Sequence, residues 1–147
     1  MIRFRDFNEG DRETFLTLCR EFYSGDAVDH PVPDEFFETT FDEILKRGPY
    51  ARGILFEEDG SLAGYGQLSF TWSNEAGGFV VLVEEILVLE EFRGKGIGTA
   101  YLRWLKEEYK DAKRFRLEVC PGNAAARKLY EKEGYVLLDY DQMICGD

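Results

Sequence analysis

A buried strand that leads through a glycine-rich turn into a helix constrains this sequence more than any other feature. Residues 79–89 are apolar except for two glutamates and are rich in β-branched side chains, which favours a strand. Residues 96–109 carry apolar side chains at helical spacing. The turn between them reads Arg93, Gly94, Lys95, Gly96, Ile97, Gly98 and Thr99. Because the first N–H groups of a helix lack partners and attract anions, we expect this turn, with its two cations, to hold a diphosphate.

Two other nucleotide-binding motifs fit the turn less well. A Walker A loop requires Ser or Thr after its lysine, but Gly96 follows Lys95. A Rossmann fingerprint requires the spacing GxGxxG, whereas Gly94, Gly96 and Gly98 are spaced GxGxG. Glu118 lies at a suitable distance for a ribose-binding acid, yet the glycine spacing disfavours that motif.

Hydrophobic spacing and turn residues predict the remaining elements. Strands are predicted at residues 2–7, 50–57, 62–72, 79–89, 115–119 and 135–144. Helices are predicted from Asn8 to Phe22, from Pro33 to Gly48, at 96–109 and at 123–133, the last ended by Gly134. The sequence has no internal repeat or linker, so residues 1–147 are predicted to form one α/β domain in the order β-α-α-β-β-β-α-β-α-β.

Two motifs resemble those of the GNAT acetyltransferases. Arg93-x-x-Gly96-x-Gly98 matches the signature [QR]xxGx[GA] of that family. The run from Asn123 to Tyr135 matches the pattern NxxAxxLYxxxGF, with Tyr where Phe is commoner. The predicted order of elements also resembles this fold over nearly the whole chain. The resemblance implies a mixed, mostly antiparallel sheet flanked by helices, and it implies acetyl-CoA as the co-substrate with no metal.

The same resemblance assigns roles to particular residues. The turn from Arg93 to Thr99 would bind the pyrophosphate of coenzyme A. The main chain of the preceding strand would pair with the pantetheine arm as an added strand, at Ile86, Leu87 and Val88. In the last helix, Asn123 would bond the pantetheine region and Ala126 would allow close approach. Tyr130 would point its hydroxyl at the thioester sulfur, and an N–H near Val88 would stabilise the oxyanion.

Amine acetylation also needs a base, because an alkylammonium of pKa about 10.4 is neutral in only about 1 molecule in 2,500 at pH 7. Glu84 and Glu85 interrupt the apolar strand. Neighbouring strand residues point to opposite faces, so only one of the two is expected to face the acceptor. Glu84 is preferred, because spermidine/spermine acetyltransferases often carry the proton acceptor at that place, and Glu85 is the second candidate. A solvated face or a salt bridge is the structural alternative for this pair.

Three further residues are weaker candidates for the acceptor cleft. His30 lies in a loop on the side where the family binds its acceptor, but an ordinary loop histidine is the favoured interpretation. Trp72 and Tyr65 could line the cleft, with core packing favoured for both.

Composition limits the partners. The formal net charge of −11 disfavours nucleic acid and anionic lipid as partners and tilts the choice slightly toward a cationic acceptor. No apolar run is long enough to span a membrane, and the N-terminus lacks the pattern of a signal peptide. The three cysteines, Cys19, Cys120 and Cys145, form no motif, which predicts reduced thiols and a cytoplasmic location.

The sequence therefore predicts an N-acetyltransferase that moves an acetyl group from acetyl-CoA to a primary amine by direct attack in a ternary complex. The acceptor is expected to be a small cationic molecule or a peptide. The alternatives are a peptide or protein N-acetyltransferase and a non-catalytic module that binds acyl-CoA. A homodimer is left open by the resemblance.

Overall fold

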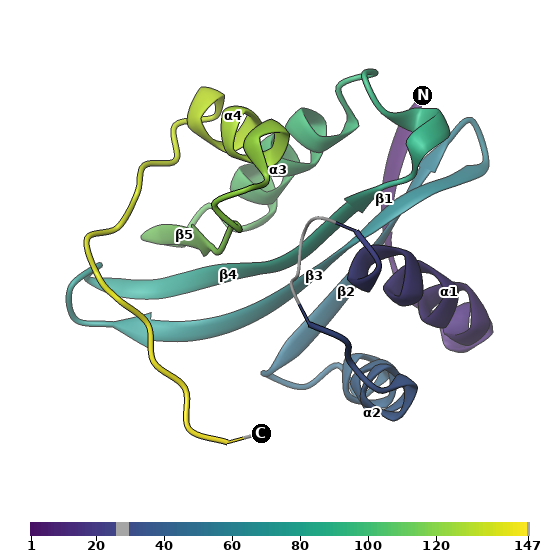
Figure 1. Cartoon of the computed structure of the whole chain (residues 1–147), viewed down its shortest axis with the longest axis horizontal. Coiled ribbons are helices and arrows are strands. Elements are labelled where there is room, and N and C mark those ends of the chain that lie inside the picture. The colour runs from purple at the N-terminus through teal and green to yellow at the C-terminus, as the bar shows by residue number, and fades with distance from the viewer. Residues whose placement is uncertain (26–29, 147) are drawn as a thin grey trace.

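In the computed structural model, which describes residues 1–25 and 30–146, five strands form one sheet in the order β1-β2-β3-β4-β5 (Figure 1). The strands are β1 (Ile2–Asp6), β2 (Ala51–Glu58), β3 (Ser61–Ser73), β4 (Gly78–Val88) and β5 (Arg114–Leu117). Neighbouring strands are antiparallel except for β4 and β5, which are parallel. Asp59 and Gly60 have positive φ angles of 49° and 83°, which close a hairpin between β2 and β3. The predicted mixed, mostly antiparallel sheet is confirmed.

Helices cover both faces of the sheet, α1 and α2 on one side and α3 and α4 on the other (Figure 1). The α-helices are α1 (Arg12–Tyr23), α2 (Asp34–Leu45), α3 (Ile97–Glu108) and α4 (Ala124–Lys132), with short 3-10 helices η1 (Glu9–Asp11) and η2 (Glu90–Phe92). Phe15 of α1 and Phe41 of α2 are fully buried on the first side. Tyr101 and Leu105, one turn apart on α3, are fully buried on the second. No helix among the described residues is long and apolar enough to cross a bilayer.

The parallel strands β4 and β5 separate before β4 ends. Their pairing runs from Val80 opposite Arg114 to Val83 opposite Leu117. β4 continues to Val88, whereas the chain after β5 turns away toward α4. From Glu84 onward, β4 therefore has a strand neighbour only on the β3 side within the described residues. This opening gives an extended ligand a free edge of main chain to pair with.

A β-bulge lies in β4 at the point where the two strands separate. Gln67 of β3 pairs with Glu85, and Leu68 pairs with Val83, so Glu84 has no partner in the register. An extra residue of this kind shifts the alternation of side chains along the strand. The bulge therefore changes which face the residues after Val83 occupy.

The predicted last strand, residues 135–144, is wrong. Residues 135–146 are described and form no strand, so the order of elements ends with α4. The chain after α4 runs as an extended segment past the β3–β4 end of the sheet (Figure 1, yellow). The alternation of apolar and polar residues is present, but a strand also requires a neighbour to pair with, and the segment has none among residues 1–25 and 30–146.

Candidate active site

The turn before α3 presents unpaired N–H groups. Gly94 and Gly96 have φ angles of 77° and 80°, a left-handed conformation that glycine adopts without strain. Gly96 is the N-cap of α3, and no side chain caps the helix. The first main-chain bond of the helix runs from the Ala100 N–H to the Gly96 carbonyl at 2.9 Å. The N–H groups of the first turn thus have no partner within the helix, which makes the turn suited to an anion.

The absence of a side chain at Gly98 brings α3 and α4 together. A Cβ placed on Gly98 would lie 2.9 Å from Cδ2 of Leu129 on α4. By contrast, a Cβ on Gly94 or Gly96 would have nothing within 4 Å, so these two glycines face open space. Gly98 is therefore required for packing, and the other two glycines for the conformation of the turn.

A cavity of about 720 Å³ lies beside this turn and along the free edge of β4. It brings together residues from β4, the turn and α4 that are distant in the sequence. Twelve of the thirteen residues predicted to bind coenzyme A line it: Ile86, Leu87, Val88, Arg93, Gly94, Gly96, Ile97, Gly98, Thr99, Asn123, Ala126 and Tyr130. The cavity thus combines an open strand edge, an uncapped helix start and a glycine turn, which suits an elongated ligand with amides and phosphates.

The two cations of the turn are placed differently from one another. Arg93 lines the cavity, and its Nε donates a hydrogen bond to the Val88 carbonyl at 2.8 Å, which ties the turn to the end of β4. Lys95 is outside the lining, and its ammonium lies 5.2 Å from the ring centroid of Phe92. Arg93 is therefore the better placed of the two to contact a ligand in the cavity.

Helix α4 contributes Asn123 and Tyr130 to the cavity. The Asn123 side-chain oxygen accepts a hydrogen bond from the Ala126 N–H at 3.3 Å and caps the helix. Its amide nitrogen is the group left for a ligand. Burial raises the pKa of the Tyr130 hydroxyl above its usual value, so this group stays protonated at neutral pH and is able to donate a proton.

Glu84 and Glu85 lie on the same face of the sheet, and the expectation that they point to opposite faces is wrong. Val83, before the pair, is buried in the core on the α3 face, and Ile86, after the pair, packs against that core. Glu85 instead accepts hydrogen bonds from the hydroxyls of Tyr23 on α1 and Tyr65 on β3. Glu84 forms a hydrogen bond with Ser69 of β3. The two neighbours of Ser69 in this strand contribute to the core on the α3 face, so the Ser69 side chain points to the opposite face. The bulge at Glu84 accounts for this arrangement.

The two carboxylates have different surroundings. Glu84 is exposed, and the pKa of its carboxyl is raised by partial desolvation, then by repulsion from Glu118 and Glu85, against the lowering effect of Ser69. Desolvation also raises the pKa of Glu85, although its two tyrosine partners act in the opposite direction. Neither carboxylate lines the cavity itself; they directly precede its residues Ile86, Leu87 and Val88.

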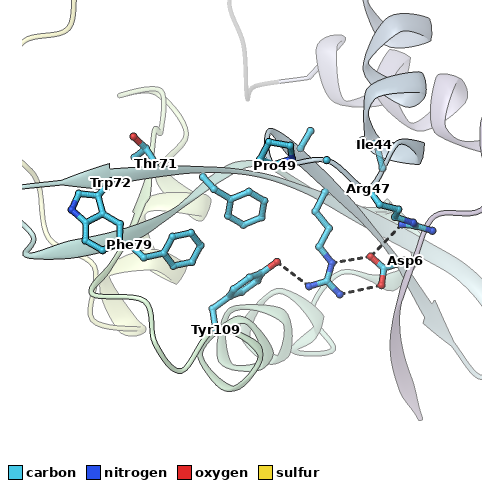
Figure 2. A pocket seen from close by; sticks show the side chains of 12 residues that line it. Asp6, Ile44, Arg47, Pro49, Thr71, Trp72, Phe79 and Tyr109 are labelled. Carbon is cyan, nitrogen blue, oxygen red and sulfur yellow. Dashed lines mark hydrogen bonds and ion pairs between the residues drawn. The ribbon is translucent and has the colours of Figure 1, made fainter.

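The three weaker candidates for the acceptor cleft lie in different parts of the structure. Tyr65 is fully buried and bonded to Glu85, so it combines core packing with contact to a candidate site residue. Trp72 is 74% exposed and lines a different cavity, of about 580 Å³ (Figure 2). His30 is exposed in the segment before α2.

Apart from Trp72, the cavity of Figure 2 contains none of the residues predicted for catalysis, coenzyme binding or the acceptor cleft. Phe79 and Tyr109 give it aromatic walls, and its Arg52 is held by Asp6 and Glu108 at 2.8 and 2.7 Å. Phe79 is six residues before Glu85, roughly 20 Å along the strand. Both of its arginines, Arg47 and Arg52, are already paired with Asp6, so this cavity is a poor competitor for the candidate active site.

Sequence reasoning missed the contribution of α1. Glu21, Phe22, Ser24 and Gly25, at the end of α1, line the cavity, and Tyr23 bonds Glu85. The sequence predicts only a helix that ends at Phe22 and assigns no functional role to this segment. No motif marks them, since their place depends on how α1 packs across β4.

Comparison with known proteins agrees with this geometry. The model of the acetyltransferase (GNAT) family matches residues 12–135. The chain belongs to the GNAT family. This result confirms the predicted family, the α/β fold and the assignment as an acetyl-CoA-dependent N-acetyltransferase.

Individual relatives are similar over different lengths. A Bacillus subtilis relative that carries the provisional name of a ribosomal protein bS18-alanine N-acetyltransferase is 33% identical over 99 residues, 66% of this chain and 61% of that protein. The thialysine N-epsilon-acetyltransferase of Bos taurus is 30% identical over 148 residues, 90% of this chain and 83% of that protein. The solved structure of AAC(6')-Iy with a bisubstrate analogue of CoA and acetylneamine has a TM-score of 0.81 at 19% identity, covering 100% of this chain and 99% of that one.

A substitution in the GNAT turn should weaken coenzyme binding. In Gly96→Val, a β-branched side chain would have to adopt the left-handed conformation, which costs about 1–3 kcal/mol, so the turn is expected to relax and its N–H groups to lose their alignment. Calorimetry should show a dissociation constant for CoA roughly tenfold or more above that of the unaltered protein.

Gly60→Val is the matched control. Gly60 has a φ of 83° and nothing within 4 Å of an added Cβ, but it belongs to the β2–β3 turn and does not line the cavity. Both variants should melt at a lower temperature, and only Gly96→Val should lose affinity. Equal CoA affinity in all three proteins would contradict a role of the turn in binding.

Proposed function

We propose that this GNAT protein acetylates a primary amine on a small cationic molecule, with Glu84 as the base and Tyr130 as the acid. The bulge in β4 is the observation that carries this proposal, because it puts two carboxylates on one face, immediately before the strand edge that lines the cavity. Acetyl-CoA supplies the acetyl group as a thioester. The protein must then hold the amine, remove one of its protons and protonate the departing sulfur.

Electrostatics favour a cationic acceptor. Glu84, Glu85 and Glu118 are close enough for Glu84 to be influenced by both of the others. An ammonium group relieves the repulsion among such carboxylates, and the net charge of −11 attracts cations to the molecule as a whole. Of the relatives, the thialysine enzyme and the structure with an acetylneamine analogue are named for amine-bearing small molecules, which is consistent with this acceptor class.

Glu84 is a better base than Glu85. Both oxygens of Glu85 accept tyrosine hydrogen bonds, which stabilise its charge and hold it in place. Glu84 has Ser69 as its hydrogen-bond partner and is exposed, so it can pass a proton on to solvent. Its raised pKa also makes it a stronger base than an ordinary glutamate. We assign Glu85 to attract and orient the ammonium group.

The proton movements then balance. Glu84 first takes one proton from the ammonium group and passes it to solvent. The neutral amine nitrogen then bonds to the thioester carbon, and the second proton that this nitrogen loses restores the Tyr130 hydroxyl once that group has acted as the acid. The carbon–sulfur bond breaks, and Tyr130 gives its hydroxyl proton to the sulfur, which otherwise leaves as a thiolate of pKa about 8.5. Main-chain groups at Val88 are the candidates to stabilise the developing negative charge on the carbonyl oxygen.

Direct transfer is favoured over a covalent acyl-enzyme. Cys19 interacts with Glu85 and Tyr65, on the carboxylate side of this chemistry. Burial and then the charge of Glu85 raise the pKa of the Cys19 thiol to about 12. A thiol that stays protonated at neutral pH is a poor nucleophile.

An acceptor panel with acetyl-CoA tests this function. Polyamines, aminoglycosides, thialysine and a peptide with N-terminal alanine should be compared by CoA release, together with calorimetry for CoA itself. Small cationic amines are expected to have the highest kcat/KM. Faster turnover of the peptide would replace the proposal with a peptide N-acetyltransferase. CoA binding without turnover of any amine would indicate a non-catalytic module instead.

A further inference from the structure

Gln67 of β3 lies on the same face of the sheet as Glu84 and Glu85. It pairs with Glu85 in the register between β3 and β4, and the side chains of directly paired residues lie on one face. The structure shows no hydrogen bond from its carboxamide to residues 1–25 or 30–146. Because the side chain is only partly buried, its oxygen and nitrogen are left for a ligand or for solvent.

The neighbours of Gln67 on this face hold the two carboxylates. Residues two positions apart in a strand share a face, so Tyr65, Gln67 and Ser69 form one row along β3. The Tyr65 hydroxyl donates a hydrogen bond to Glu85, and Ser69 forms one with Glu84. Gln67 is therefore the middle member of a row whose two outer members bind the candidate catalytic carboxylates.

A primary ammonium group requires hydrogen-bond acceptors on three sides. Its three N–H groups point in three directions, and each needs an acceptor when the group leaves water. In the proposed function, Glu84 accepts one N–H, whose proton it removes, and Glu85 accepts a second. The oxygen of Gln67, directly across the strands from Glu85, is placed to accept the third.

We propose that Gln67 is a specificity-determining residue whose carboxamide oxygen accepts the third N–H of the ammonium group held by Glu84 and Glu85. This role rests on the proposed function, since it takes these two carboxylates as the site of the amine. After Glu84 has removed one proton, Glu85 and Gln67 still hold the two remaining N–H groups, so the neutral amine stays in place. A methyl group in place of one N–H leaves an acceptor unpaired, and the site therefore selects a primary amine over its N-methylated form.

An uncharged acceptor suits this position better than a third carboxylate. Desolvation, and then repulsion from Glu118 and Glu85, already raise the pKa of Glu84. Gln67→Glu would place a further negative charge directly opposite Glu85 and would raise the pKa of Glu84 more. A carboxamide accepts the N–H group without this repulsion, so Glu84 stays ionised and able to take a proton.

Agmatine and agmatine methylated once on its amino nitrogen test the proposal, because each has a single amino group. The unaltered protein should prefer agmatine. Gln67→Met removes the acceptor and keeps a side chain of similar length. It should lower kcat/KM for agmatine by about 10- to 100-fold, as expected for a hydrogen bond to a charged group, and change kcat/KM for the methylated form by less than about twofold. The ratio of the two values is the decisive readout, because a purely structural defect would lower both alike.

Thr71→Val is the control, since Thr71 continues the same row two positions after Ser69 and is exposed. This variant should keep the ratio of the unaltered protein. CoA affinity should be unchanged in both variants, because neither residue lines the coenzyme cavity.

Two outcomes separate this proposal from the proposed function. Turnover of agmatine with an unchanged ratio in Gln67→Met would overturn the role of Gln67 and leave the proposed function intact. If agmatine is not turned over, calorimetry of both amines with the CoA complex gives the same comparison. A preference for agmatine that Gln67→Met abolishes would then support the role of Gln67 and contradict the proposed catalysis, whereas no such preference would overturn both.

Discussion

Glu84→Gln should lower kcat for amine acetylation by about 10²- to 10⁴-fold, the range typical of a lost general base. Gln keeps the shape of the side chain and a hydrogen-bonding partner for Ser69, so the fold should be retained. CoA affinity should change little, because Glu84 does not line the coenzyme cavity. Steady-state kinetics with the best amine of the panel, together with calorimetry for CoA, would measure both effects.

The pH profile gives an independent check on this base. Because the pKa of Glu84 is raised above its usual value of 4.5, the carboxylate becomes protonated at a higher pH than an ordinary glutamate. In the unaltered protein, kcat/KM should therefore fall as pH drops through this raised pKa, and Glu84→Gln should lack that limb. Glu107→Gln, at an exposed site on α3, should behave like the unaltered protein. A larger loss for Glu85→Gln than for Glu84→Gln would transfer the base to Glu85.

Tyr130→Phe should lower kcat by about 10²-fold at neutral pH, with little change in CoA affinity. Phe retains the packing of the ring in α4 and removes only the hydroxyl that would protonate the sulfur. The defect should shrink as pH rises above about 8.5, because the thiolate then leaves without needing a proton. A rate comparison between pH 7 and pH 9 measures this change.

Tyr50→Phe is the control for the loss of a hydroxyl, because Tyr50 is 71% exposed in the segment before β2. It should match the unaltered protein at both pH values. The raised pKa of Tyr130 means that its hydroxyl remains protonated over much of this range, so a loss of Tyr130 ionisation does not explain the expected trend. An equal defect of Tyr130→Phe at both pH values would argue for a positioning role of the hydroxyl.

The coenzyme side of the site could be predicted from the sequence because it depends on local chemistry. The left-handed glycines at 94 and 96, the uncapped start of α3 and the helix at Asn123 all follow from residues close together in the chain. The acceptor side could not be predicted in this way, because it depends on the register between β3 and β4. The faces of Glu84 and Glu85 are set by the shift opposite Gln67, and strand alternation alone gives the wrong answer.

The predicted strand at residues 135–144 was wrong for a related reason. Periodicity in residues 135–144 indicates what the segment would form if it had a neighbour, and it contains no information on whether one is present. The contribution of α1 also depends on long-range packing, because Tyr23 and Glu85 are 62 positions apart in the chain and meet only where α1 packs against the sheet. Local motifs were sufficient to predict the residues around the coenzyme, whereas the residues around the acceptor depend on long-range packing.

The early parting of β4 from β5 also bears on the handling of this enzyme. Past Val83, one side of β4 presents bare peptide groups to its surroundings, the kind of surface on which other polypeptides readily stick. If the pantetheine arm pairs with this edge as an added strand, it shields these peptide groups for as long as the coenzyme is bound. The coenzyme would then stabilise the protein as well as supply the acetyl group, and excess CoA during purification should reduce aggregation.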